Sequence, residues 1–285
     1  MRINIFIRYL ITLLLLALAI WLGKALWDHY MHSPWTRDGR VRADVITLSA
    51  DVSGLVTQVA VKDNQPVRKG DVLFVVDRAR YAAALTQAEA ALAGQRSEKN
   101  RRGQEAARRN GLDSAVVSAE NRETAAFAAA AAGAQYQAAL AARDLARLNL
   151  ERTVVRAPVD GFVTNLNVHV GDFAAVGAPK LALIDRNSYR VEGYFEETKL
   201  PLLKPGAKVD ITLLSGGPTL RGHVASVARG ITDRDAGTGR ELLADVNPTF
   251  NWVRLAQRVP VRIELDALPA GQLLVAGTTC TVVVR

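Results

Sequence analysis

The feature that most constrains the fold is a short repeat whose two copies are separated by about seventy-five residues of different character. Residues 50–57 (ADVSGLVT) return 107 positions later as residues 157–164 (APVDGFVT), and five of the eight positions are identical. Each copy is a run of short β patterns, and a segment this short cannot bury a hydrophobic face alone. The two copies are therefore predicted to pack on each other as one small β sandwich. Its structural turn glycines are Gly54, Gly70, Gly161 and Gly177.

Residues 78–152, between the two copies, have the composition of helix. Twenty-five of these 75 residues are alanine, three are aromatic and none is proline. The break comes near Asn110-Gly111, and Ser118 can cap the start of a returning helix. Helices of roughly 78–109 and 118–151 would each reach about 50 Å at 1.5 Å per residue. We predict an antiparallel helical hairpin, and the alternative is a solvated helical spacer.

The two predicted helices are expected to pack through stripes of apolar or small side chains. Spacings of three and four residues are typical of a coiled-coil seam. On the returning helix the stripe is Val117, Thr124, Phe127, Ala131, Ala134, Ala138, Ala141, Leu145 and Leu148. On the outgoing helix it is Tyr81, Leu85, Ala88 and Leu92, after which the helix turns polar. An alanine-rich seam buries little apolar area, so the tip of the hairpin is expected to be less stable than its base.

The amino-terminal segment is predicted to anchor the chain in a membrane. Residues 10–22 are almost unbroken apolar sequence, with Arg8 and Lys24 as the nearest charges. Extended to 9–27, the segment has about nineteen residues, close to the roughly twenty that span a bilayer. Arg2 and Arg8 precede the segment, which favours a cytoplasmic stub at 1–8 and a body on the other side. The alternative is a cleaved signal peptide at Ala17-Leu18-Ala19, but bulky residues follow this A-x-A site. In a bacterium the uncleaved anchor means a single pass through the inner membrane with a periplasmic body.

Residues 187–285 read as a third module of short strands, for which a small β-barrel is the expected fold. The candidate strands are 189–195, 207–213, 220–228, 259–265 and 277–285, with one brief helix at 196–203. Gly230–Asn247 is polar and glycine-containing, so we expect a loop there. Residues 36–49 alternate and are predicted as one strand leading up from the membrane. The sandwich then comprises 36–77 and 153–186.

Charge and cysteine content narrow the possible partners and chemistry. The net charge of +8 fits a membrane surface, a nucleic acid or an acidic partner. The basic residues are scattered and no zinc spacing occurs, so nucleic-acid binding is not expected. Cys280 is the only cysteine, and its alternating apolar surroundings predict a buried strand thiol.

The candidate catalytic and metal-binding groups are few and isolated. Asp28, His29 and His32 have the helical spacing of a metal pair, but they lie at the membrane edge without further ligands. Glu196 and Glu197 are adjacent, and neighbours in sequence do not face each other on a helix. No phosphate-binding glycine loop, nucleophile elbow or paired-cysteine motif occurs. We predict no catalytic residue, no metal and no cofactor, so the chain is not expected to be an enzyme.

A sandwich in two separated halves joined by a helical hairpin resembles the lipoyl-like domain of periplasmic adaptor (membrane fusion) proteins, the haemolysin-secretion-D (HlyD) family. The sequences that carry this resemblance are 52–56 (VSGLV), 67–74 (VRKGDVLF) and 156–161 (RAPVDG). Residues 143–153, 164–168, 196–200 and 252–262 (WVRLAQRVPVR) are similar to adaptors of p-hydroxybenzoic (aromatic carboxylic) acid efflux pumps.

The resemblance implies a mainly β fold with an α-helical hairpin. Its parts are an N-terminal transmembrane helix, a lipoyl-like barrel-sandwich hybrid split by an antiparallel coiled-coil hairpin at 78–152, and a C-terminal small β-barrel. The function it implies is tripartite efflux, in which the adaptor joins an inner-membrane transporter of the fusaric-acid-resistance type to an outer-membrane channel. Self-association as a trimer or hexamer is implied as well. Lipoyl carriers place a modified lysine where this chain has the hairpin, so no carrier lysine is expected.

The resemblance also indicates which residues would meet the outer-membrane channel. Adaptors that dock on the common channel carry an Arg, a Leu and a Ser around the hairpin tip, and Arg108, Leu112 and Ser118 are similar, with one residue fewer between the Leu and the Ser. The docking candidates are Arg108, Arg109, Leu112, Ser114 and Ser118. Ordinary turn and capping chemistry is the alternative role for each. Two other functions stay open: an adaptor for a multidrug or peptide and protein exporter, and a membrane-anchored carrier domain or envelope scaffold.

Overall fold

The computed structural model describes residues 2–31, 34–113, 116–231, 237–238, 244–245, 256–266 and 273–285. Contacts divide the chain into two compact units, and each unit has its own hydrophobic core. One unit combines Met1–Asp44 with Ser188–Arg285, and the other is Val45–Asn187. The chain therefore leaves the first unit after Asp44 and returns to it at Ser188.

Helix α1 (Arg2–Met31) contains the segment that was predicted as the anchor. Its apolar part, Ile7–Trp27, is 21 residues long and contains an 18-residue window with a mean hydropathy of 2.1, none of which is buried against the rest of the chain. By length and composition this helix can cross a bilayer.

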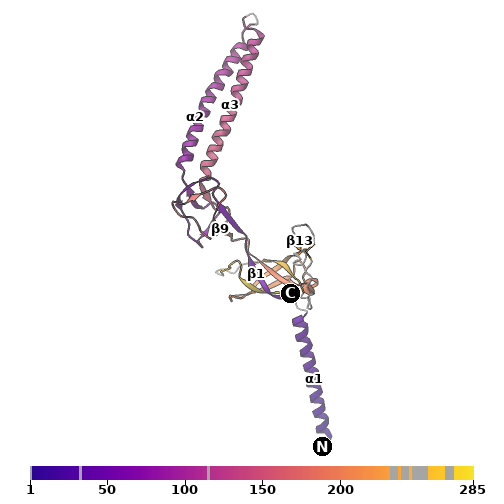
Figure 1. Cartoon of the computed structure of the whole chain (residues 1–285). Coiled ribbons are helices and arrows are strands. Elements are labelled where there is room, and N and C mark those ends of the chain that lie inside the picture. Colours follow the sequence, from indigo (N-terminus) through magenta and orange to yellow (C-terminus); the bar gives the residue numbers. More distant parts are fainter. Residues whose placement is uncertain are drawn as a thin grey trace. The chain divides into compact units, whose positions relative to one another are not determined.

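The carboxyl-terminal module is a closed six-stranded barrel (Figure 1). Its strands, in hydrogen-bonded order, are β1 (Trp35–Arg42), β10 (Arg190–Glu196), β15 (Arg258–Leu265), β12 (Leu220–Val227), β11 (Lys208–Leu213) and β16 (Thr279–Val284). Alternate side chains point inward, and Phe195, Ile211 and Ile263 are fully buried in the core. All five strands predicted between 187 and 285 are present, and the brief helix is a 3₁₀ helix, η1 (Glu197–Leu202).

The sixth barrel strand corrects one sequence-based expectation. Residues 36–49 were predicted as one strand of the sandwich, but they form β1 in the barrel and β2 (Val45–Ser49) in the sandwich. β1 pairs with β10 on one side and β16 on the other, and so closes the barrel and removes its open edges. The alternating pattern was read correctly as strand. It could not reveal that the chain changes cores at Ala43-Asp44.

The segment that was predicted as a polar loop, 230–247, lies mostly outside the described residues. Within it the structure describes residues 230–231 and two short paired strands, β13 (Gly237–Thr238) and β14 (Ala244–Asp245). Residues 252–255 of the motif at 252–262 also lie outside the described residues.

Cys280 is buried on β16, as predicted from its alternating surroundings. Burial raises the pKa of its thiol to about 11, so the thiol stays protonated and unreactive at neutral pH. Gly39 on β1 lies beside it, and a Cβ there would come within 2.7 Å of the Cys280 sulfur. The thiol is thus a packing element of the barrel core.

The sandwich consists of two four-stranded sheets, and each sheet takes two strands from each copy of the repeat. One sheet has the order β2, β9 (Pro179–Asp185), β7 (Gly161–Thr164), β4 (Pro66–Val67). The other has the order β6 (Val154–Arg156), β5 (Val72–Val76), β3 (Gly54–Val59), β8 (Phe173–Ala174). Buried side chains from both copies, among them Phe74, Val163 and Leu183, form one core. Neither copy has a sheet of its own.

The offset of 107 residues also relates the two sheets strand by strand. Adding 107 to the residue numbers places β2 on β6, β3 on β7, β4 on β8 and β5 on β9. When each strand of the first sheet is replaced by its counterpart, the order β2-β9-β7-β4 becomes β6-β5-β3-β8, which is the order of the second sheet. The sequence repeat is therefore an approximate twofold repeat of structure.

The four repeat glycines serve two different purposes. Gly70 and Gly177 have φ of 92° and 75°, in the left-handed region where glycine is favoured, and they occupy turns. Gly54 and Gly161 instead begin strands β3 and β7. A Cβ at Gly54 would lie 2.7 Å from Val76 Cγ1, and a Cβ at Gly161 would overlap the carbonyl oxygen of Ile184.

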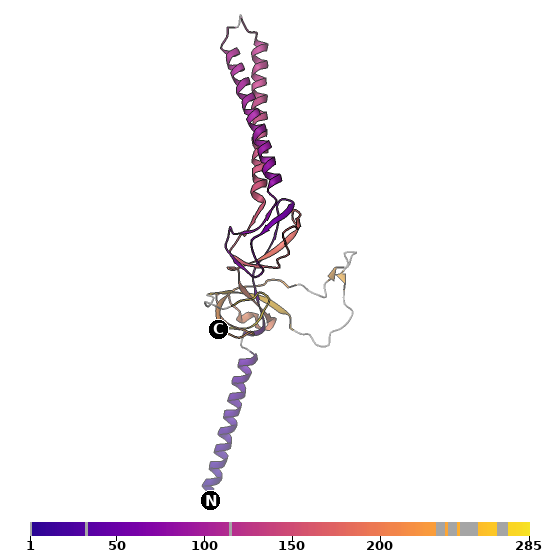
Figure 2. The ribbon, with the colours of Figure 1, turned by 90° about the vertical axis from the view of Figure 1, so that its left-hand side faces the viewer.

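Helices α2 (Ala79–Asn110) and α3 (Ala119–Arg152) run side by side as an antiparallel hairpin (Figures 1 and 2). Its base is joined to the sandwich by side chains from both helices. The Tyr81 hydroxyl donates a 2.7 Å hydrogen bond to the Ser53 carbonyl oxygen. Arg152 Nε lies 3.7 Å from a carboxylate oxygen of Asp51. These contacts hold the hairpin on the first copy of the repeat.

The contact face of α3 differs from the predicted stripe. Only Val117 of that stripe is half-buried, and the other eight residues are exposed, including Phe127 (66%) and Leu145 (59%). The residues that are buried or half-buried at the same spacing form an inner stripe: Arg122, Ala125, Ala129, Ala132, Tyr136, Ala139, Arg143, Ala146 and Leu150. The predicted contact stripe of α3 was therefore wrong. The predicted contact stripe of α2 was right, since Tyr81, Leu85, Ala88 and Leu92 are all half-buried.

The predicted stripe on α3 was wrong because alanine occurs on every face of this helix, so the spacing of small residues does not distinguish one face from another. The inner stripe combines small residues, which allow close approach, with long side chains that reach across. Lys99 Nζ of α2 lies 4.5 Å from the ring centroid of Tyr136, a cation–π contact between the helices. Larger apolar side chains, Phe127, Leu145 and Leu148, are left on the outside.

The glycines at the strand starts yield a graded prediction. Gly161→Ala should destabilise the sandwich by about 1–3 kcal/mol, because the new methyl group meets backbone that cannot move aside. Gly54→Ala should cost less, because its neighbour is the end of a side chain. Gly133→Ala on α3 is the control: it meets open space and should stabilise the hairpin by roughly 0.5–1 kcal/mol.

Hydrogen-exchange mass spectrometry across a urea series reports on sandwich and hairpin peptides separately and so measures all three variants. Equal losses of sandwich stability in Gly54→Ala and Gly161→Ala would show that contact with the Ile184 carbonyl group does not cause the destabilisation.

Candidate functional site

The hairpin tip, residues 108–118, joins the end of α2 to the start of α3. Ser114, one of the five docking candidates, lies outside the described residues, as does Ala115. The structure describes the other four candidates, and it places them in different environments. Arg108 and Leu112 are exposed, Arg109 is half-buried, and Ser118 is the N-cap of α3.

Ser118 has the capping role that its position predicted. Its hydroxyl accepts a hydrogen bond from the backbone N–H of Asn121 at 3.3 Å, and its backbone is extended. Glu120 follows in the first turn, where a negative charge is favoured by the helix dipole.

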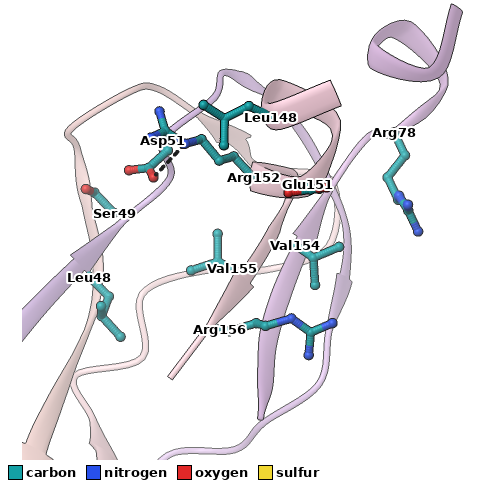
Figure 3. Close-up of a pocket in the computed structure, with 10 residues that line it drawn as sticks. All are labelled: Leu48, Ser49, Asp51, Arg78, Leu148, Glu151, Arg152, Val154, Val155 and Arg156. Atoms are coloured by element: carbon teal, nitrogen blue, oxygen red, sulfur yellow. Dashed lines mark ion pairs between the residues drawn. The ribbon is translucent and has the colours of Figure 1, made fainter. Parts of the chain in front are cut away.

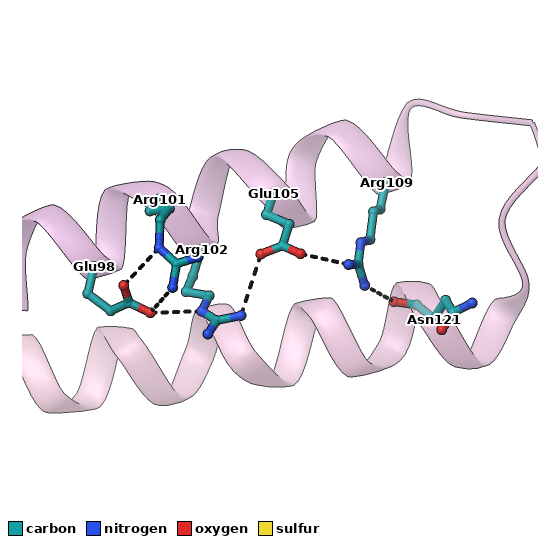
Figure 4. Close-up of polar contacts among 6 residues, drawn as sticks. All are labelled: Glu98, Arg101, Arg102, Glu105, Arg109 and Asn121. Atoms are coloured by element: carbon teal, nitrogen blue, oxygen red, sulfur yellow. Dashed lines mark hydrogen bonds and ion pairs between the residues drawn. The ribbon is translucent and has the colours of Figure 1, made fainter.

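Arg109 is engaged within the hairpin. One of its terminal nitrogens lies 2.6 Å from a Glu105 carboxylate oxygen, and the other donates to the Asn121 carbonyl oxygen of α3 at 3.4 Å. Figure 4 shows how this side chain bridges the two helices below the tip. No hydrogen bond or ion pair of the Arg108 side chain is present within the described part of the chain. Of the two arginines, Arg108 is therefore the one free to meet another molecule.

Arg122, in the first turn of α3, contacts the tip and is a residue that the sequence reasoning missed. It donates to the carbonyl oxygen of Leu112 at 3.0 Å and so ties the loop back to α3. The signal that could have found it is its spacing, since Arg122 begins the inner stripe that continues through Ala125 and Ala129. A stripe chosen by apolar character alone leaves out such a residue.

Apolar side chains are exposed at the tip. Leu112 is 44% exposed and Val116 is 70% exposed. Val116 and Val117 are held by hydrogen bonds from their backbone N–H groups to the Asp113 carbonyl oxygen, at 3.0 and 3.2 Å. The described part of the tip thus presents apolar groups, and local hydrogen bonds hold the backbone at Val116 and Val117.

Below the tip, the inner face of α2 carries charged side chains in place of an apolar seam. Glu98 accepts hydrogen bonds from Arg101 and Arg102, and Arg102 also lies 3.5 Å from Glu105 (Figure 4). Hydrogen bonds from Arg101 and then Arg102 lower the pKa of Glu98 to about 2. Glu98 therefore stays ionised in the folded hairpin until the pH nears 2. The stability that its pairing contributes is fully present above the unfolded-state pKa of about 4.5 and is lost as the pH falls through the folded-state pKa of about 2.

The outer face of α3 is the second candidate surface. We call it the outer stripe, and it consists of Thr124, Phe127, Ala131, Ala134, Ala138, Ala141, Leu145 and Leu148. Three of its members, Phe127, Leu145 and Leu148, are exposed large apolar side chains, and exposed apolar patches are a common mark of a protein–protein contact. The stripe extends along most of α3, from near the tip to the base of the hairpin.

At the base the outer stripe runs into a groove of about 640 Å³, which we call the root groove (Figure 3). Its wall includes Leu48 of β2, Val154 of β6 and Leu148 of α3. β2 and β6 are the edge strands of the two sheets, so backbone groups on one side of each strand have no strand partner among the described residues. Arginine side chains and carboxylates complete the lining: Arg78, Arg152, Arg156, Asp51 and Glu151.

The candidate chemical groups that the structure describes do not come together. Glu196 and Glu197 are exposed. His32 and the side chains of Asp28 and His29 lie outside the described residues. Two histidines that were not candidates are also separate: His169 is exposed, and His223 lies 2.8 Å from Asp266 on the barrel surface. No group of three or more His, Cys, Asp or Glu residues that could hold a metal ion occurs in the part of the chain that the structure describes. The geometry is suited to contact between proteins: a long helical arm, an apolar tip and an exposed apolar flank.

Two protein-family descriptions match the chain. Residues 79–151 match the alpha-helical hairpin domain of the pHBA AAEA subunit, and residues 188–285 match the AAEA-like beta-barrel domain. A protein of Escherichia coli strain K12, the uncharacterized protein YdhJ, is 44% identical over 278 residues, which are 98% of this chain and 98% of that protein.

Solved structures share the fold at low sequence identity. The membrane fusion protein Spr0693 of Streptococcus pneumoniae R6 is 17% identical with a TM-score of 0.64, over 89% of this chain and 99% of that one. A MacA–MexA chimera that contains the Pseudomonas aeruginosa MexA hairpin is 24% identical with a TM-score of 0.57, over 88% of this chain and 81% of that one.

The Ser118 cap yields a testable prediction. Ser118→Ala should raise the exchange rate of the first-turn amides of α3 about fivefold, because loss of an N-cap costs about 1 kcal/mol. Ser118→Asp should keep the slow rate, since aspartate caps as well as serine does. Hydrogen-exchange mass spectrometry measures both.

The control is Ser97→Ala in the middle of α2, where the hydroxyl bonds only back to the Ala93 carbonyl oxygen. It should leave exchange at the tip unchanged. Unchanged exchange in Ser118→Ala would mean that the cap does not hold the start of α3.

Proposed function

Because the chain belongs to the family of periplasmic adaptor (membrane fusion) proteins, of the AAEA type, we propose that it is the adaptor of a tripartite pump that exports aromatic carboxylic acids. Adaptors of this family serve efflux pumps, are non-catalytic, and work with an inner-membrane transporter and an outer-membrane channel. The observation that carries the proposal is the long hairpin with an apolar tip, on a chain whose hairpin and barrel both match the family.

The proposed location is the bacterial inner membrane, crossed once by residues 9–27, with residues 1–8 in the cytoplasm and the body in the periplasm. The apolar helix α1 supports it, and so do Arg2 and Arg8, which precede the apolar segment as cytoplasmic flanks do. The barrel begins at Trp35, close to the end of α1, so it is the part best placed to meet the transporter, for which we propose the fusaric-acid-resistance type.

The proposed cargo, aromatic carboxylic acids, rests on the family description of the hairpin, which names the pHBA subunit. The positive net charge of +8 suits an anionic cargo and suits anionic lipid headgroups equally. An adaptor for a multidrug or peptide and protein exporter is the second candidate function.

We propose that the hairpin tip docks on the outer-membrane channel. Leu112 and Val116 supply exposed apolar contact area, and Arg108 supplies a charge that no described side chain neutralises. Arg109 and Ser118 would act through the tip's shape, because their side chains bind α2 and α3 themselves. Ser114 remains a docking candidate from the sequence.

We further propose that copies of the chain associate, as a trimer or hexamer, through the outer stripe and the root groove. The stripe leaves Phe127, Leu145 and Leu148 in water in the single chain, and it is continuous with the edge strands at the groove. Covering these side chains with another copy would remove apolar area from water at about 25 cal/mol per Å².

Growth of a deletion strain tests the export function. Across a panel of aromatic acids, dyes and detergents, we expect hypersensitivity to the aromatic acids alone. The intact gene should restore resistance, and a gene with 80–152 replaced by a short turn should not. Sensitivity to dyes and detergents as well would favour the multidrug adaptor, and rescue by the armless gene would favour the scaffold.

Tip docking is tested in the same strain with Val116→Asp/Val117→Asp. Two charges on the apolar tip should abolish resistance to the level of the empty vector, while the folded chain is retained in the membrane fraction. The control is Val170→Asp/Val176→Asp, at two exposed valines of the sandwich loops, which should support growth. Full growth with the tip variant would count against docking through the tip.

Self-association is tested by sedimentation of the full chain in a neutral detergent. Phe127→Glu/Leu145→Glu should weaken association at least tenfold, about 1.4 kcal/mol, because two charges would enter an apolar contact. The control is Gln87→Glu/Gln104→Glu, which adds two charges at exposed positions of α2 and should leave association unchanged. Equal association of both variants would place the contact elsewhere.

A further inference from the structure

The barrel has a cationic pocket that the efflux mechanism above does not use. It has a volume of about 410 Å³, within the range of roughly 300–1,000 Å³ typical of ligand pockets. Its lining comes from the start of β1, from β10, from η1 and from the start of β15: Trp35, Thr36, Arg37, Asp38, Tyr194, Glu196, Lys199 and Arg258. We call it the Trp35 pocket.

Two cations lie against the same indole ring in this pocket. The Arg37 guanidinium carbon is 5.4 Å and Lys199 Nζ is 5.3 Å from the ring centroid of Trp35. Lys199 is mostly buried and also donates to the Trp35 backbone carbonyl oxygen at 3.3 Å. The ring therefore holds the positive charges in place by cation–π attraction.

The charges of the pocket do not cancel. Asp38 is engaged by Arg258, and Glu196 lies 3.6 Å from Lys199. Three cations against two carboxylates leave one positive charge in excess. No carboxylate pairs with Arg37 within the described part of the chain, and its side chain is exposed. The pocket is complementary to a ligand with one negative charge.

The chain itself limits how far this pocket can be from the apolar helix. α1 ends at Met31 and β1 begins with Trp35. At a maximum of about 3.6 Å per residue, Trp35 lies within roughly 14 Å of the end of α1. Tryptophan and tyrosine beside arginine and lysine are the residues that occupy the headgroup layer next to a spanning helix.

We propose that the Trp35 pocket binds the headgroup of an anionic phospholipid, with Arg37 as the residue that meets the phosphodiester. The occupied ring of Trp35 favours this ligand over the aromatic cargo, since both cations already lie against the indole. The inference rests on the proposed membrane anchor. Binding would fix the barrel at the membrane surface, where the transporter is reached.

The test uses the full chain in nanodiscs of equal parts phosphatidylglycerol and phosphatidylcholine, followed by native mass spectrometry of the lipids it retains. The wild-type chain should retain phosphatidylglycerol in preference. Arg37→Gln should lower the ratio of retained phosphatidylglycerol to phosphatidylcholine about fivefold, the effect expected for one arginine at a headgroup. Arg37→Lys should keep most of the preference for phosphatidylglycerol. Arg221→Gln, an exposed arginine of the barrel outside the pocket, removes the same charge and should leave the ratio unchanged.

Equal losses in Arg37→Gln and Arg221→Gln would overturn the proposal, because the preference would then come from net charge alone. Displacement of the lipid by p-hydroxybenzoate, or by inorganic phosphate, would overturn it in favour of a cargo site or a general anion site. The measurement needs no transporter or channel. If the chain supports export but shows no lipid preference, only the pocket proposal is rejected. If the chain retains the lipid preference but does not support export, only the export function is rejected.

Discussion

Mutual burial of the two repeat halves is the constraint on which the second unit, Val45–Asn187, depends. Each sheet of the sandwich contains strands from both halves, so neither half can fold to a stable sheet without the other. The chain between them is therefore free to leave as a long excursion and must return to the same core. The hairpin is that excursion, and the contacts of Tyr81 and Arg152 with the first half join its base to the sandwich.

The hairpin itself is built with little apolar burial. Only Ala106, Ala125 and Ala132 are buried in its described residues, and charged groups take the place of a seam toward the tip. Glu98, Arg102, Glu105 and Arg109 pair with one another along α2 by charge-assisted hydrogen bonds, and Arg109 also reaches the Asn121 carbonyl oxygen of α3. Such exposed pairs each contribute little to stability, which fits an arm that is ordered by its base and presents its far end to a partner.

An adaptor needs surfaces more than it needs a reactive group, and the chain distributes them along its length. The apolar tip, the outer stripe of α3 and the Trp35 pocket are separate in sequence and differ in chemistry. Apolar contact suits the tip and the stripe, where a protein surface would exclude water. A cationic, aromatic pocket suits a charged headgroup. These differences make the three proposed contacts separable by substitution, since none shares a side chain with another.

Local patterns and a direct repeat were enough to predict the split sandwich, the hairpin, the barrel strands, the apolar helix, the Ser118 cap and the buried Cys280. The place of Trp35–Arg42 in the barrel could not be predicted in this way, since an alternating pattern does not indicate which strands a segment pairs with. Tertiary structure decided this pairing, and it also decided which face of α3 meets α2. In a helix so rich in alanine, small residues line every face. The face of α3 that meets α2 is distinguished by long side chains, since Arg122 donates to the Leu112 carbonyl oxygen and Tyr136 contacts Lys99.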